Sequence, residues 1–184
     1  KYSNQVVWEE IKQQTPVYNF DSLRTADMSE AVINLKDGTE ITLDENSMIL
    51  ISFQENKVDI DFSRGSIKAN RDNVNDKALQ TLQIKSKGAL VSIAKSDVSL
   101  SKDAGQDLSL TVNKGDATIK SGENQQIIKQ DQKVVATDEE LKVYELNLKL
   151  LTPGPGDYFT LKGQSGSYTA DFTWEEVKGP FDLY

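Results

Sequence analysis

The chain has 184 residues, 37% of them apolar, and its 29 acidic residues outnumber its 21 basic ones, which gives a formal net charge of -8 at pH 7. It contains no cysteine and no histidine, which excludes thiol nucleophiles, Ser-His-Asp triads, zinc sites with the usual ligands and haem ligation through either residue. The acidic balance argues against nucleic acid as a partner, because phosphate binding needs clustered Lys and Arg. The sequence contains no run of about 18 apolar residues, so it predicts no membrane-spanning helix.

Residues 5–20, QVVWEEIKQQTPVYNF, favour two short strands. Aromatic and β-branched residues supply strand preference, and Pro16 disfavours a helix through the middle of the segment. We therefore expect the first β-structure of the chain here.

A hairpin is predicted over residues 29–50, SEAVINLKDGTEITLDENSMIL, where apolar residues occupy every second position on both sides of an Asp-Gly pair. A two-residue turn would mix buried and exposed side chains on one face of the sheet. A three-residue loop, Lys36-Asp37-Gly38 with Gly38 at positive φ, keeps the two faces separate. It predicts an outer face of Val32, Asn34, Glu40 and Thr42, and an apolar face on which Leu35 pairs with Thr39, Ile33 with Ile41 and Ala31 with Leu43.

The same alternation continues past the hairpin and is punctuated by glycine. The recurring unit is a strand that ends in a basic residue and glycine and is followed by another strand, as in FSRGSIKA, IKSKGALVSI and VNKGDATIK. Gly65, Gly88 and Gly115 are 23 and 27 residues apart, a spacing that suggests stacked hairpins of similar size. Short strands between turn residues are typical of all-β folds. We predict an all-β protein of antiparallel stacked hairpins forming a sandwich or solenoid-like roll, with few or no helices.

The segment TDEELKVYELNLKLL fits either a helix or a strand. Thr137 and Glu140 form a capping-box pattern, which favours a helix. Leu146, Leu148 and Leu150 alternate strictly, which favours a strand. We expect a strand, and the pattern leaves the alternative open.

A cluster of proline and glycine at residues 153–156 predicts a domain boundary. We expect residues 1–150 to form one all-β domain, and residues 151–184 to contain a linker and the strands of a second domain. The end of the chain, YTADFTWEEVKGPFDLY, resembles the opening strands of an immunoglobulin or fibronectin-like domain, which needs about 100 residues and would be truncated here. Alternatively, residues 157–184 join the first sheet, with Trp174 packing against it.

Few residues have the pattern of a ligand site. Asp59, Asp61 and Ser63 resemble the first ligands of a calcium loop, but the glycine and glutamate that such a loop needs are replaced by Arg64 and Asn70. Solvent-facing carboxylates between apolar residues are the favoured interpretation.

Other candidates have simpler explanations. The two carboxylates of a glycosidase lie about 5 to 9.5 Å apart across a cleft. Neighbouring acids on a strand instead point to opposite faces of the sheet. We therefore interpret three acidic pairs as solvated charge: Glu9-Glu10, Glu139-Glu140 and Glu175-Glu176. A sugar-stacking platform is less favoured than burial in strands for the aromatic residues Trp8, Tyr18, Phe20, Tyr158 and Trp174. Gly154 and Gly156 lack the helix and Lys-Ser/Thr pair of a phosphate loop. We assign no catalytic, cofactor-binding or metal-binding residue and name no binding residue.

The first half of the chain carries a family resemblance. Arg24-Thr25, the LKDGTEITL hairpin, Asn46-Ser47 and the strand VDIDFSRGSIKA resemble the FecR domain, a family named for the envelope regulator of iron-citrate transport. The resemblance covers about residues 6–136. In its second half, Ala94-Lys95-Ser96 stands where the family has Arg-Gly-Thr, and Asp131-Gln132 stands where it has Gly-Gln.

This resemblance implies an exported all-β module of the bacterial cell envelope, periplasmic or surface-exposed. The chain opens KYSNQVVWEE, so we expect that a signal peptide either was removed or never existed. With the absent catalytic residues, the resemblance predicts a non-catalytic module, without cofactor, that binds or spaces envelope components such as a protein partner or peptidoglycan. The alternative is the periplasmic signal-transducing part of a sigma-factor regulator, and a third possibility is a carbohydrate-active enzyme.

Overall fold

A computed structural model describes residues 8–72, 74, 81–102, 107–137, 140–146, 150–152 and 173–174, the side chains of 150–152 and 174 excepted. Within these ranges the regular structure is entirely β, as the sequence predicts, and there is no helix that could cross a membrane. The strands are β1 (Ser22–Arg24), β2 (Ala31–Asn34), β3 (Glu40–Leu43), β4 (Met48–Gln54), β5 (Lys57–Asn70), β6 (Thr81–Ser86), β7 (Ala89–Ile93), β8 (Asp97–Lys102), β9 (Leu108–Lys114), β10 (Asp116–Ser121), β11 (Asn124–Lys129), β12 (Gln132–Ala136), β13 (Leu141–Glu145), β14 (Leu150–Thr152) and β15 (Thr173–Trp174).

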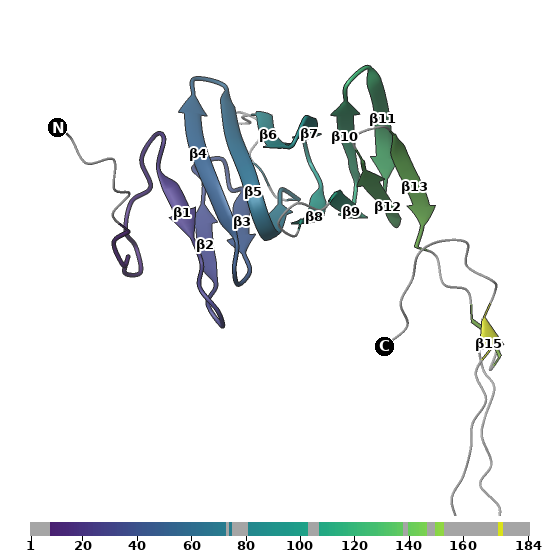
Figure 1. Ribbon diagram of the computed structural model, residues 1–184, viewed down its shortest axis with the longest axis horizontal. Coiled ribbons are helices and arrows are strands. Elements are labelled where there is room, and N and C mark those ends of the chain that lie inside the picture. The colour runs from purple at the N-terminus through teal and green to yellow at the C-terminus, as the bar shows by residue number, and fades with distance from the viewer. Residues whose placement is uncertain are drawn as a thin grey trace, which may run out of the picture.

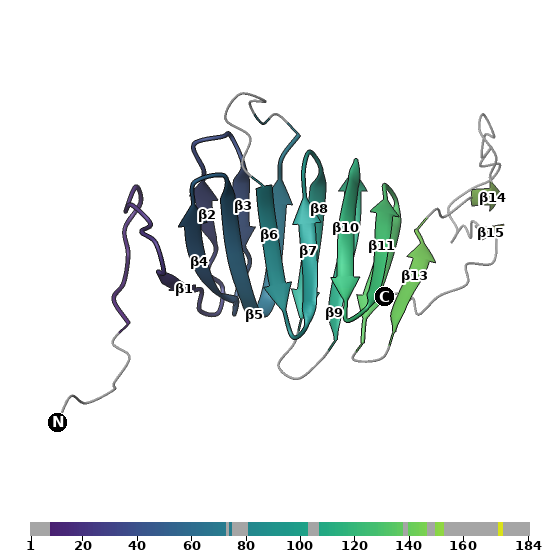
Figure 2. The same ribbon diagram turned by 90° about the horizontal axis from the view of Figure 1, so that it is seen from above.

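The first thirteen strands form two facing layers that share one long strand. Layer A has the order β1-β4-β5-β6-β7-β10-β11, and layer B has the order β2-β3-β5-β8-β9-β12-β13. Figure 2 shows β4, β6, β7 and β10 of layer A in front, with β2, β3, β8 and β9 of layer B behind them. The chain passes repeatedly from one layer to the other, so the two layers grow together from the N-terminal end (Figure 1). This arrangement is the predicted stack of antiparallel hairpins.

The first half of β5 lies in layer A and the second half in layer B. Residues 57–64 pair with β4, and Gly65 to Asn70 pair with β8 in the other layer. The next strand, β6, returns to layer A beside β5 and runs parallel to it, whereas the other pairings among the described strands are antiparallel. Parallel neighbours of this kind cannot be joined by a tight hairpin turn.

The β2–β3 hairpin has the predicted register. Ile33 pairs with Ile41 and Ala31 with Leu43, and the Leu35 N–H donates to the Thr39 carbonyl at 2.8 Å across a three-residue loop. Gly38 has a φ of 92°, which a glycine adopts without the steric penalty of a Cβ. The separation of faces is therefore confirmed, with Ile33, Ile41 and Leu43 buried, and Val32, Asn34 and Glu40 exposed.

The core fills the space between the layers with aliphatic side chains from the inward face of each strand. In β4 both alternating phases of the sequence are apolar, and a register shift between Met48 and Ile49 selects the inward one. Ile49 and Ile51 are 1% and 0% exposed, whereas Leu50 is 38% exposed on the outer face. Other buried side chains of this core are Ile60, Phe62, Ile67, Leu82, Ile84, Val91, Leu100, Leu110, Val112, Ile119 and Val134.

The two strands predicted within residues 5–20 are wrong for the described part of that segment. Residues 8–21 contain turns but no strand, and β1 begins at Ser22. The Phe20 N–H donates to the Ile51 carbonyl and the Ile51 N–H to Asp21, so only the end of the segment reaches a partner strand. Strand preference alone does not form a strand without a ladder to join.

The three glycines of the recurring unit have two different roles. Gly88 lies in the tight turn of the β6–β7 hairpin, as stacked hairpins require. Gly65 and Gly115 instead lie where the chain bends from one layer to the other, Gly65 within β5 and Gly115 between β9 and β10. The expectation that all three units are hairpins is wrong for Gly65 and Gly115. A corner between layers and a hairpin turn both favour glycine at a positive φ, so the sequence pattern is the same for the two structures.

The ambiguous segment after Thr137 is a strand where it is described. β13 pairs with β12 along its whole length, so the strand interpretation is confirmed for residues 141–145. β14 and β15 pair with each other in a separate two-stranded sheet. The predicted linker at residues 153–156 and most of the predicted second domain lie outside the described residues.

A candidate binding groove beside strand β2

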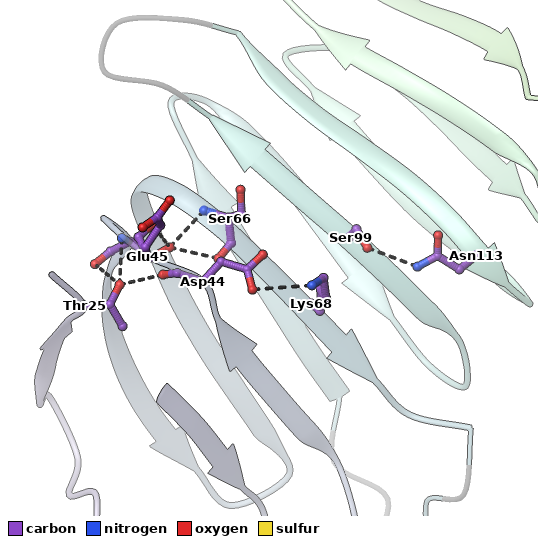
Figure 3. Close-up of polar contacts among 8 residues, drawn as sticks. Thr25, Asp44, Glu45, Ser66, Lys68, Ser99 and Asn113 are labelled. Carbon is purple, nitrogen blue, oxygen red and sulfur yellow. Dashed lines mark hydrogen bonds and ion pairs between the residues drawn. The ribbon is translucent and has the colours of Figure 1, made fainter. Parts of the chain in front are cut away.

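The residues that carry the family resemblance form a hydrogen-bonded corner between the layers. The Thr25 hydroxyl donates to the Asp44 carbonyl at 2.6 Å and accepts from the Ser47 N–H at 2.9 Å. The Ser47 hydroxyl in turn donates to the Ser66 carbonyl and accepts from the Ser66 N–H, both at 2.9 Å. Figure 3 shows Thr25, Asp44 and Ser66 converging where the strands bend, with Lys68 on Asp44. These motif residues therefore join the backbone of three neighbouring segments.

A second corner repeats the first further along the chain. Ser96 is 0% exposed and its hydroxyl donates to the Asp116 carbonyl at 2.9 Å. Gly115 packs against this serine as Gly65 packs against Ser47, since a Cβ on either glycine would meet the serine or its neighbour within 3.0 Å. Ser96 ends the Ala94-Lys95-Ser96 segment, which departs from the family pattern, yet the corner forms. The sequence spacing of serine and glycine could have revealed this repeat.

The turn of the β2–β3 hairpin is anchored by a buried ion pair. Arg71 Nη2 lies 3.0 Å from Asp37 Oδ2, and the exposed fractions of the two residues are 0% and 2%. Asp37 also accepts from the Thr39 N–H at 2.9 Å, which is the usual role of aspartate in a turn. Burial lowers the pKa of the Arg71 guanidinium, and the charge of Asp37 opposes that shift. The pair fixes the turn to the end of β5.

A groove of about 690 Å³ lies beside β2, at the N-terminal end of the two layers. One wall is the edge of β2 with its following turn, and the other is the irregular segment before β1. Its lining is more apolar than polar, from Gln14, Thr15, Pro16, Val17, Val32, Ile33, Asn34, Leu35, Lys36, Asp37 and Phe53. Ligand-binding clefts combine apolar side chains with polar groups that can fix the orientation of a ligand, and this lining contains both kinds.

The outer wall of the groove is held in place by hydrogen bonds to β4. Asn19 accepts from the Phe53 N–H at 2.8 Å, and the Tyr18 N–H donates to Asp21 at 2.7 Å. Val17 is half-buried and packs against the core. A turn in which the Thr15 N–H and hydroxyl donate to the Lys12 carbonyl shapes the outer end of the wall. The segment is thus docked on layer A although it forms no strand.

The inner wall of the groove carries an open strand edge. Among the described residues β2 pairs with β3 alone. The hydrogen bond from Leu35 to Thr39 fixes the pattern of the ladder, and in an antiparallel pair the alternate residues direct their backbone groups away from the partner. The backbone N–H and C=O groups of Val32 and Asn34 therefore point toward the groove, and both side chains are exposed.

The calcium-like pattern in β5 does not form a cation site. Asp59 is 6% exposed, and its carboxylate lies 2.8 Å from Lys57 and 3.4 Å from Lys85. Asp61 is exposed, as the solvated interpretation expects, but that interpretation is wrong for Asp59, which is buried and paired with the two lysines. Within the described ranges no cluster of three acidic side chains could hold a metal ion.

The remaining sequence candidates are scattered. Glu9 and Glu10 are exposed in the irregular segment. Trp8, Tyr18 and Phe20 are 39%, 66% and 69% exposed, so their predicted burial in strands is wrong, and Trp8 lies 5.0 Å from the Arg24 guanidinium in a cation–π contact. Side-chain placement falls outside the described residues for Glu139, Glu175, Glu176, Gly154, Gly156, Tyr158 and Trp174. Sequence analysis assigns no binding residue and therefore does not locate the groove, which depends on the strand order that leaves β2 with an unpaired edge.

Comparison with known proteins adds to this geometry. The FecR protein family matches residues 21–118, from just before β1 into β10, a narrower span than the resemblance seen in the sequence. An uncharacterized protein of Treponema pallidum (strain Nichols) is 30% identical over an alignment of 148 residues, and the match covers 76% of this chain and 21% of that protein. The chain thus spans about a fifth of the relative's length.

Two crystal structures of a candidate anti-sigma factor from Parabacteroides distasonis ATCC 8503 share the fold. Their TM-scores are 0.59 and 0.58 at 11% sequence identity. The similarity covers 68% of this chain and 60% or 59% of those chains, so the chain spans less than two thirds of either. At this identity the likeness concerns the fold alone.

Proposed function

Because the chain belongs to the FecR protein family, we propose that it is a non-catalytic, protein-binding module of a bacterial cell envelope. The observation that carries the proposal is the family match over residues 21–118. It covers both corners of the fold. The absence of cysteine and histidine from the chain agrees with a binding role.

The family motif supports binding rather than chemistry because its buried polar residues are engaged within the fold. Thr25 and Ser47 bond to backbone groups at the first corner, and Asp37 is paired with Arg71. What remains for a partner is strand edge and sheet face. Open edges of this kind serve protein recognition through main-chain hydrogen bonds, so we place the protein partner ahead of peptidoglycan.

A second candidate is the periplasmic, signal-transducing part of a sigma-factor regulator. The observation that favours it is the shared fold with the candidate anti-sigma factor structures. This warrant is an analogy between folds. In this candidate the partner transmits a signal through the domain to the regulator of transcription.

Photo-crosslinking in living cells tests the proposal. A photoreactive amino acid is placed singly at exposed positions, with Asn34 beside the groove and Asn113 on the outer face of β9 as a distant control. We expect a discrete, protease-sensitive adduct in the envelope fraction from the Asn34 position and not from the Asn113 control. Adducts that muramidase digestion removes, or no adduct from any position, would overturn the protein-binding role.

Transcript profiling separates the two candidates. If the chain is the sensing part of a sigma-factor regulator, deletion of residues 21–118 from the full-length protein changes the transcripts of one coherent set of promoters. If it is an envelope-binding module without a role in sigma-factor regulation, the same deletion leaves transcription unchanged, and the protein crosslink is still observed with the intact chain.

We further propose that residues 1–150 form one domain and that residues 151–184 contain a linker and the beginning of a second. The proline and glycine residues at 153–156 support this division. Limited proteolysis tests it: cleavage should concentrate near these residues and leave a resistant N-terminal fragment. If the first cleavage instead fell in the loops that connect the strands of layers A and B, the division into domains would be contradicted.

A further inference from the structure

We propose that the groove beside β2 binds an extended, acidic peptide segment of a protein partner, which adds to layer B as a new edge strand next to Ala31–Asn34. This inference rests on the proposed function and deepens it by naming the surface and the chemistry of the partner.

The backbone of β2 supplies the first part of the recognition. Val32 and Asn34 direct their N–H and C=O groups toward the groove, because Leu35 bonds to Thr39 on the other side of the strand. An extended segment in the groove would satisfy these groups by main-chain hydrogen bonds. No other described strand pairs with β2 on this side.

The lining of the groove sets the side-chain pattern of the segment. Successive side chains of a strand point to opposite faces, so every second residue of the added strand would face inward, beside Ile33. Val17 and Phe53 are half-buried at this end of the core and would cover such a side chain. The intervening residues would face outward beside Val32. The groove therefore favours alternating apolar and polar residues.

The charge of the groove sets the sign of the polar residues. Its charged side chains are Lys36 and Asp37. Asp37 is neutralised by Arg71, which leaves Lys36, an exposed side chain, as the net charge among the lining residues. The exposed residues Glu30, just before β2, and Glu40, opposite Asn34 on β3, do not line the groove. The chain as a whole carries -8, but interactions between exposed charges more than about 8 Å apart are largely screened at physiological salt. A carboxylate beside Lys36 therefore gains a local attraction.

The test is a binding titration on the whole chain. The probe is a fluorescent hexapeptide that alternates glutamate and valine, read by anisotropy, and its charge-reversed partner alternates lysine and valine. We expect the wild-type chain to prefer the glutamate peptide. Lys36→Glu should invert that preference, because it changes the sign of the charge at the rim. A preference for the lysine peptide in the wild-type chain would overturn the proposal.

Proline substitution tests the strand edge itself. Val32→Pro removes an N–H that points into the groove, while proline at an edge strand is tolerated, and we expect the glutamate peptide to bind about tenfold more weakly or not at all. Ile127→Pro is the matched control. Ile127 is exposed on β11, the opposite edge of the stack, and its N–H points outward, since the Lys129 N–H two residues on bonds to the Gln132 side chain rather than to β10.

The outcomes decide the proposal as follows. Equal binding by wild type and Val32→Pro, or equal weakening by both proline variants, overturns it. Sedimentation equilibrium covers a second occupant: a dimer that Val32→Pro dissociates would assign the edge to a second copy of the chain and likewise overturn it. If Val32→Pro does not fold by circular dichroism, the charge inversion at Lys36 decides. Crosslinking to a protein in cells without peptide binding would overturn the proposed groove site and leave the proposed function standing. Peptide binding without any cellular protein adduct would leave the groove site standing and overturn the proposed function.

Discussion

Arg71, the residue directly after β5, donates to Asp37 in the turn between β2 and β3 across 3.0 Å, and both side chains are buried. The two residues are 34 positions apart in the sequence. The contact ties the hairpin that forms one wall of the groove to the strand that joins the two layers. The stability of the fold and the shape of the groove therefore both depend on this ion pair.

Removal of one member of the pair should be costly. Arg71→Met leaves a buried carboxylate without its partner, and breaking a buried ion pair costs about 3–5 kcal/mol. Lys68→Met is the control, because Lys68 pairs with Asp44 at the surface at 3.4 Å, and such pairs are worth about 0–1 kcal/mol. Urea unfolding measures both. A loss at Arg71 no larger than at Lys68 would show that the turn does not depend on the pair.

The corner glycines should tolerate substitution less than the hairpin glycine. Gly88→Ala meets open space but keeps a positive φ of 82°, a strain of about 1–2 kcal/mol. Gly65→Ala adds a Cβ 2.3 Å from Ser47 Cα, which should cost about 1–3 kcal/mol more through overpacking. The free energies of unfolding of the two variants give the comparison. Equal losses would contradict the assignment of Gly65 to a packed corner.

The repeated corner predicts similar roles for two serines. Ser47→Ala and Ser96→Ala each remove a hydroxyl that bonds to backbone at 2.9 Å, and buried groups left without a partner cost about 1–3 kcal/mol. Ser99→Ala serves as control, because Ser99 lies on the outer face of β8, where its hydroxyl accepts from Asn113 (Figure 3), and should change stability by about 0.5 kcal/mol or less. Thermal unfolding ranks the three variants. The interpretation would fail if Ser99→Ala were as harmful as the corner variants.

The two faces of β2 should respond differently to truncation. Ile33 is 7% exposed and pairs with Ile41 in the core, so Ile33→Ala should cost about 2–5 kcal/mol. Asn34 is exposed on the next residue of the same strand, and Asn34→Ala should stay within about 0.5 kcal/mol. Denaturant midpoints at equal slope measure both. Similar losses would mean that the register of the hairpin is different.

Sequence reasoning was most accurate where the determining contacts are local. The β2–β3 hairpin follows from alternation and from the parity of a loop that contains Gly38, so its register could be derived from adjacent residues. The all-β class followed in the same way from the repetition of short alternating segments. The reading of residues 5–20 failed because a strand also needs a neighbouring ladder, and only the end of that segment has one.

The sequence by itself determined the fold class, the register of the first hairpin and the exclusion of most catalytic chemistry, because these depend on composition and on neighbours along the chain. Tertiary structure alone decided that Gly65 and Gly115 are corners, that Asp37 meets Arg71, and that β2 is left with an open edge beside Val17 and Phe53. Each of these depends on which distant segments become neighbours when the layers pack. Local periodicity carries no information about that choice, since the same alternation fits many strand orders.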